Sequence, residues 1–129
     1  MRPLLIIAAI SGFSAVLLGA MGSHFLSPMM DDKGQANFQI ANLYHLIHSL
    51  ALLGCVLLAS IMREMPKALT FLKWATACYS LGILLFSGIL YYVAIFPGFA
   101  LHYLIPMGGL SYMAGWLMLV RVALTIKKP

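Results

Sequence analysis

The stretch WATACYSLGILLFSGILYYVAIFPGFALHYLIPMGGLSYMAGWLMLV, from Trp74 to Val120, contains no charged residue over 47 positions. A helix needs about 20 apolar residues to cross the roughly 30 Å hydrocarbon core of a bilayer, so this stretch is long enough for two crossings and a turn. Pro97 and Gly98 lie in its middle, and a Pro-Gly pair is a strong signal for a turn that ends a helix. The stretch therefore predicts two membrane-spanning helices that are joined at this pair.

Two further charge-free stretches lie toward the amino end, Pro3–Met30 with 28 residues and Gly34–Met62 with 29. Each is long enough for one crossing. The whole chain of 129 residues is 63% hydrophobic and 9% charged, with a mean hydropathy of +0.99, whereas roughly a quarter of the residues of soluble domains are charged. These values exclude a water-soluble catalytic domain and a nucleic-acid-binding domain.

We therefore predict an all-α fold, an integral membrane four-helix bundle that forms a single four-span domain over residues 1–129. The fourth helix is expected to begin near Leu104, because this start places Pro106 in the first turn, where proline is tolerated. Asp31 and Asp32 are expected near the start of the second helix, because carboxylates are favourable at the positive amino end of a helix. The four spans are predicted near residues 4–26, 37–62, 74–96 and 104–126.

Lys and Arg are distributed unevenly between the two sides of this topology. Lys33 alone falls on one side, and seven basic residues fall on the other. Because cytoplasmic loops carry the excess of basic residues, we expect both termini on the cytoplasmic side. The net charge of +5 then reflects topology rather than affinity for nucleic acid. The seven residues are Arg2, Arg63, Lys67, Lys73, Arg121, Lys127 and Lys128.

Small residues recur at helical spacing in three of the predicted spans, and such residues let membrane helices approach closely. Two interpretations remain open, namely packing within one bundle and a seam between copies or with a larger membrane complex. The two interpretations are compatible with each other. The candidate packing residues are Ser11, Ala15, Gly19, Gly22, Gly88, Gly108, Gly109 and Gly115.

The second predicted span has one polar, aromatic face that contains Tyr44, His45 and His48. The topology places His24 and His102 at the same outer side of the membrane, so these five residues form a candidate polar or ligand-binding cluster. Imidazoles within a span suit haem, quinone or metal binding, and they suit hydrogen bonds between helices equally well. No Asp or Glu lies within a span, so we predict no metal site and no cofactor.

Four short motifs, one in each predicted span, follow one another in a fixed order. They are GAMGSH at residues 19–24, then Phe38, Ala41, Tyr44, His45 and 48–52, then 85–88 with Leu90 and Tyr91, and finally 106–109 with Gly115 and Trp116. This set resembles a bacterial inner-membrane family numbered 423 among the domains of unknown function, whose eukaryotic branch is called transmembrane protein 256. The resemblance implies a small polytopic protein with four helices and no particular reaction. The family pattern has Thr where this chain has Ile105.

Three functions remain open at this point. The first is a structural or accessory membrane protein that acts through helix packing. The second is an oligomeric transporter or channel for a small solute, and the third is a haem, quinone or metal site at the outer histidines. An enzyme is not expected, because no nucleophile with a base, no carboxylate pair and no phosphate-binding loop occurs in the sequence. No catalytic residue is therefore assigned.

Overall fold

The computed structural model describes residues 1–126, and all regular structure in that range is helical. Four helical segments are long and apolar enough to cross a membrane, which confirms the all-α four-span fold. Lys127 and Lys128, which we counted with the basic side, lie outside the described residues. The elements in order are α1 (Arg2–His24), η1 (Ser27–Met29), α2 (Asp32–Ile61), α3 (Pro66–Gly82), η2 (Ile83–Gly88), α4 (Ile89–Ile95), η3 (Ala100–Leu104) and α5 (Ile105–Thr125).

The helices extend beyond the charge-free stretches at several ends. Helix α2 begins at Asp32, five residues before the predicted start, because the Asp31 carboxylate accepts a hydrogen bond of 2.7 Å from the Gly34 amide and caps the helix. Helix α3 begins at Pro66 rather than at Trp74. Hydropathy marks the part of a helix that suits the membrane, whereas the helix itself continues into the charged boundary. Proline lies in the first turn of α5, as predicted.

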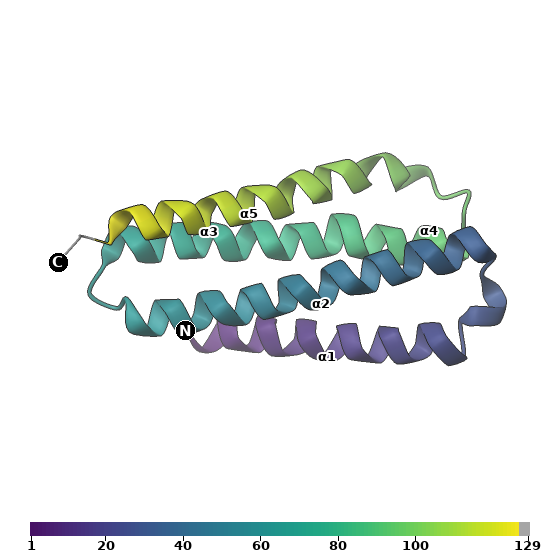
Figure 1. The fold of residues 1–129 in the computed structure, drawn as a ribbon, viewed down its shortest axis with the longest axis horizontal. Coiled ribbons are helices and arrows are strands. Elements are labelled where there is room, and N and C mark those ends of the chain that lie inside the picture. Colours follow the sequence, from purple (N-terminus) through teal and green to yellow (C-terminus); the bar gives the residue numbers. More distant parts are fainter. Residues whose placement is uncertain (127–129) are drawn as a thin grey trace.

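The four spans lie side by side in the order α5, α3 to α4, α2, α1 (Figure 1). Helix α3 packs along α5, and α2 packs on α3, η2 and α4. Helix α1 packs mainly on α2, so only 11% of its most apolar window is buried in the molecule, against 39% for α2. Helix α1 begins and helix α5 ends at the same end of the molecule, which is also the end of the α2 to α3 connection (Figure 1).

Glycines allow the close approach of α5 to the third span. The Tyr79 ring of α3 covers Gly115 of α5, and the Tyr112 ring of α5 covers Gly82 of α3 in return. Gly108 lies directly against the backbone of Leu85 and Phe86 in η2, where a methyl group would collide with main-chain atoms. Packing of this kind holds membrane helices together in the absence of a hydrophobic drive between them.

The other candidate packing residues differ in how closely they contact a neighbouring span. Ala15 is fully buried, Gly19 lies against the Asn42 side chain, and Gly22 lies against the Phe38 ring. Gly109 has only the Phe86 ring nearby, 3.7 Å from the position that a Cβ atom would take. Gly88 is exposed, and its only close neighbour is the carbonyl oxygen of Ile83 in the same helix, so it makes no close contact with another span.

Candidate functional site

His45 and His48 are both buried, with 4% and 3% of their surfaces exposed, and both lie at the middle of α2. Residues three apart on a helix are neighbours but point in directions about 60° apart. The two imidazoles therefore meet different parts of the molecule. His48 faces α5, whereas His45 faces α1 and α4.

His48 is held on every side by aromatic and backbone groups. The Trp116 indole N–H of α5 donates to its Nε2 at 3.2 Å, so the Nδ1 atom carries the proton and donates to the Tyr44 carbonyl oxygen at 2.8 Å. The ring stacks on Tyr112 with centroids 3.6 Å apart and an interplanar angle of 12°. Both nitrogens are occupied in one neutral tautomer, which leaves His48 no free atom for a metal or a ligand.

His45 lies in a hydrogen-bonded chain that crosses three helices. The Asn42 amide donates to the Ala15 carbonyl oxygen of α1 at 2.7 Å and to the Tyr91 hydroxyl of α4 at 3.0 Å. Tyr91 is therefore free to donate to His45 Nδ1, 3.2 Å away. On the other side of the ring, the Ser14 hydroxyl donates to a backbone carbonyl oxygen at 2.9 Å, so its oxygen accepts from His45 Nε2 at 3.4 Å.

A second set of hydrogen bonds joins α1 to α2 near this chain. The Ser49 hydroxyl donates to the His45 carbonyl oxygen at 2.7 Å, so the Ser11 hydroxyl is the donor in the 2.7 Å bond between the two serines. Every donated hydrogen in these bonds has one acceptor, since Asn42 uses its two amide hydrogens on two different acceptors, and the directions are mutually consistent. The bond of 3.4 Å from His45 to Ser14 is the longest among them.

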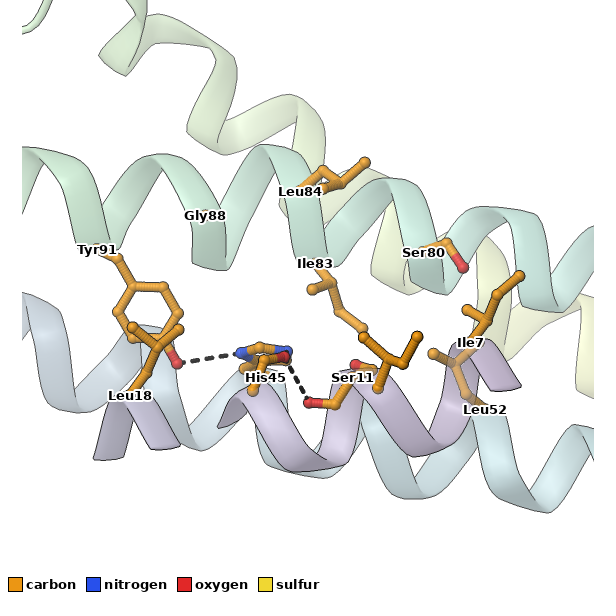
Figure 2. A pocket seen from close by; sticks show the side chains of 12 residues that line it. Ile7, Ser11, Leu18, His45, Leu52, Ser80, Ile83, Leu84, Gly88 and Tyr91 are labelled. Carbon is orange, nitrogen blue, oxygen red and sulfur yellow. Dashed lines mark hydrogen bonds between the residues drawn. The ribbon is translucent and has the colours of Figure 1, made fainter. Parts of the chain in front are cut away.

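A cavity of about 400 Å³ lies beside His45, between α1 and the continuous helix formed by α3, η2 and α4. Figure 2 shows Tyr91 reaching from that helix to His45, and Ile83 pointing toward the same space. Six of the twelve lining residues are aliphatic, and the residues with polar groups are Ser14, His45 and Tyr91 of the hydrogen-bonded chain together with Ser11 and Ser80. We call this cavity the lateral groove, and its lining residues are Ile7, Ile10, Ser11, Ser14, Leu18, His45, Leu52, Ser80, Ile83, Leu84, Gly88 and Tyr91.

The helix wall of the groove contains a π-helical segment, Ile83–Gly88. Such segments are rare within α-helices and occur frequently at functional sites. Three of its residues, Ile83, Leu84 and Gly88, line the groove. On the opposite side of the segment, the buried Ser87 hydroxyl lies 2.9 Å from the Tyr112 hydroxyl of α5. The segment thus connects the groove to the aromatic cluster around His48.

The five candidate cluster residues do not converge on one cavity. His45 lines the groove, His48 lies in the aromatic cluster, and Tyr44 is 40% exposed with its ring 6.0 Å from those of His48 and Tyr112. His24 and His102 are exposed, and His102 bonds to the backbone of its own turn. Among residues 1–126, no three His, Cys, Asp or Glu side chains gather in a way that could hold a metal ion.

Three residues of the polar chain, Ser14, Asn42 and Tyr91, were not among the candidate site residues. Asn42 lies three residues before His45 in α2, so helical spacing alone places the two next to each other. Trp116 entered the sequence analysis only as part of a motif, and its position against α2 makes it the donor to His48. Tyr79 is fully buried, and its hydroxyl has no hydrogen-bond partner among the described residues.

Comparison with known proteins gives a consistent result. A family model described as "Protein of unknown function (DUF423)" matches residues 18–109. The inner membrane protein YgdD of Escherichia coli K12 is 37% identical over 127 residues, which cover 98% of this chain and 93% of that protein. The membrane protein YwdK of Bacillus subtilis is 32% identical over 95% of this chain and 97% of that protein, and a Staphylococcus epidermidis membrane protein is 32% identical over 93% of both. No solved structure matches the chain.

Proposed function

The chain belongs to the DUF423 family, whose relatives are small inner-membrane and membrane proteins, and we propose that it is an accessory membrane protein that binds a neutral, lipid-soluble carbonyl compound in the lateral groove. The observation that carries this proposal is the groove itself. Its volume of about 400 Å³ lies within the usual range of small-molecule sites, which are mostly apolar with a few convergent polar groups. Its position between spans makes it reachable from the bilayer.

The hydrogen-bond directions indicate which head group the groove would accept. The Ser14 hydroxyl already donates to a backbone carbonyl oxygen, and the Tyr91 hydroxyl already donates to His45. Neither residue therefore has a free donor for a ligand. The His45 Nε2–H makes only the bond of 3.4 Å to Ser14, and a carbonyl oxygen in the groove would be a better acceptor. The favoured ligand is therefore an apolar molecule with a carbonyl oxygen at one end, such as a quinone.

Binding of a radiolabelled short-chain ubiquinone to the purified protein in phosphatidylcholine nanodiscs tests this proposal. Ile10 and Val16 are both well exposed on α1, but only Ile10 lines the groove. We expect Ile10→Trp to weaken binding about tenfold, a loss of about 1.4 kcal/mol, and Val16→Trp to leave binding unchanged. Equal effects of the two variants, or no saturable binding in the unaltered protein, would contradict the proposal.

A third variant tests the head-group assignment separately. Ser14→Ala removes the acceptor that competes with the ligand for the His45 N–H. If the carbonyl oxygen binds there, Ser14→Ala should bind the quinone a few times more tightly, even though it loses a contact of the free protein. Weaker binding by this variant would show that the ligand uses another part of the groove.

A role through helix packing is the second candidate, and one specific observation favours it. Helix α1 packs mainly on α2 and exposes Ile10, Phe13 and Val16, each more than 60% exposed, so another helix could pack on the same side. The partner would be a second copy or a larger membrane complex. Crosslinking in native membranes followed by mass spectrometry tests this role, and a strictly monomeric species without partners would contradict it.

We propose a binding role rather than a catalytic one. We also propose that both termini lie in the cytoplasm. By the bounds of the elements, five of the basic residues among residues 1–126 belong to the end where α1 begins and α5 ends (Figure 1), whereas Lys33 alone belongs to the other end. The positive-inside rule favours this orientation. The five residues are Arg2, Arg63, Lys67, Lys73 and Arg121.

A further inference from the structure

A second cavity lies at the basic end of the molecule, between the first turns of α3 and the last turns of α5. Its volume is about 1070 Å³, and it is separate from the lateral groove, with which it shares no lining residue. Two cationic side chains line it, Lys67 from α3 and Arg121 from α5. The rest of the lining is apolar or hydroxylic, namely Met65, Pro66, Ala68, Thr70, Phe71, Leu124 and Thr125.

The two cations in this cavity are not neutralised by the described part of the chain. Among residues 1–126, no carboxylate lines the cavity, and of the three acidic side chains in the sequence only Glu64, in the connection between α2 and α3, belongs to the same end. The Arg121 guanidinium lies 5.2 Å from the centroid of the Phe71 ring, so a cation–π contact holds it over the α3 wall. Arg121 retains its hydrogen-bond donors in this position, because a contact with a ring face uses none of them.

The surroundings favour an anion that carries an apolar part. The hydroxyls of Thr70 and Thr125 donate to carbonyl oxygens of their own helices, so Lys67 and Arg121 are the side chains that remain to meet an anion. Met65, Phe71 and Leu124 provide an apolar wall beside them. Basic pockets between helices near the membrane surface are suited to phospholipid head groups, whose phosphates guanidinium and ammonium groups bind well.

We propose that this cavity binds the phosphate of an anionic phospholipid through Lys67 and Arg121, with the glycerol and the start of an acyl chain against the apolar wall. The site gives the basic end of the protein a specific lipid contact in addition to its general attraction to anionic membranes. The volume favours a lipid over a free phosphate ion, which would leave the apolar wall unused.

The test uses the full-length protein in detergent micelles, titrated with dioleoylphosphatidylglycerol and followed by native mass spectrometry. The double variant Lys67→Gln, Arg121→Gln should bind about twenty-fivefold more weakly than the unaltered protein, from roughly fivefold for each charge. The matched control is Lys33→Gln, which removes a basic residue at the opposite end and should leave binding unchanged. Circular dichroism and the melting temperature establish that each variant is folded.

Three outcomes would overturn the proposal. The first is an equal loss of binding in Lys33→Gln, and the second is equal affinity for dioleoylphosphatidylcholine, which carries the phosphate but no net charge. The third is full displacement of the lipid by a few millimolar inorganic phosphate, which would reassign the site to a soluble anion. The Ile10→Trp variant of the lateral groove should retain phosphatidylglycerol binding, so the two sites succeed or fail independently.

Discussion

His48 illustrates how its neighbours can occupy a buried imidazole completely. An intramembrane histidine suggests a ligand site, because polar groups are costly in the bilayer and are usually retained for a purpose. Here Trp116 and the Tyr44 carbonyl oxygen occupy both nitrogens, and Tyr112 covers one ring face. His45 is similar in burial, but one of its two bonds is long and it lines a cavity. The bonds that each ring makes, rather than its burial, distinguish the two residues.

The hydrogen bond from Trp116 to His48 leads to a prediction at this scale. Trp116→Phe should lower the free energy of unfolding by about 1 to 2 kcal/mol, because it removes the bond and leaves the buried Nε2 acceptor without a partner. Trp74→Phe is the matched control, since Trp74 is 60% exposed and makes no side-chain hydrogen bond among the described residues. Titration of the folded protein with sodium dodecyl sulfate, followed by circular dichroism, measures both changes. Equal losses would show that the bond does not contribute.

At the scale of elements, α5 approaches the backbone of η2 closely at Gly108. Gly108 lies against the backbone of Leu85 and Phe86, so an added methyl group cannot be accommodated by rotating a side chain. The neighbouring Gly109 has space, because the nearest atom to its Cβ position is 3.7 Å away. Two adjacent glycines in one helix therefore have opposite tolerance for the same substitution.

We expect Gly108→Ala to destabilise the protein by about 1 to 3 kcal/mol, as overpacked cores do. Gly109→Ala should be neutral or stabilising by up to about 1 kcal/mol, because alanine favours the helix more than glycine does. Thermal melting in detergent, followed by circular dichroism, compares the two variants. A similar loss for both would indicate that the contact of Gly108 with η2 relaxes easily.

The elements also show how far sequence can predict this structure. The absence of charge over long stretches was sufficient to predict four spans, because the cost of burying charge in hydrocarbon does not depend on the fold. The absence of charge was not sufficient to predict where α3 begins, because Lys67 and Lys73 are compatible with a helix that extends past the membrane boundary. The π-helical segment has no hydropathy signal, since it depends on how Ile83–Gly88 packs against α5.

At the scale of the whole molecule, the lateral groove results from an open arrangement. Because α1 packs mainly on α2, the space between α1 and the third span is not filled by a neighbouring helix. Sequence showed that α1 has small residues, but the helix that those residues meet depends on the relative positions of four spans. The polar chain could be predicted only in part for the same reason, since His45, Asn42 and Tyr91 come from two helices that are distant in sequence.

The proposed orientation leads to a prediction at this scale. In a background without Cys55 and Cys78, the variant Lys33→Cys should react with a membrane-impermeant maleimide in intact spheroplasts, whereas Glu64→Cys should react only after the membrane is permeabilised. The reason is that Lys33 lies in the first turn of α2 and Glu64 lies in the connection at the opposite end. Labelling is measured by gel shift. The reverse pattern of labelling would place both termini outside.

The π-helical segment also determines how far α4 is rotated about the helix axis relative to α3. Each residue of an α-helix turns the chain by about 100°, so deleting one residue from Ile83–Gly88 and restoring regular α-helix would rotate α4 by about that angle relative to α3. The Tyr91 hydroxyl would then swing away from His45 and Asn42, while Tyr79 upstream would keep its place against Gly115. The third span thus consists of two helices that are rotated relative to each other about the helix axis. The length of the π-helical segment between them determines which side chains face α2.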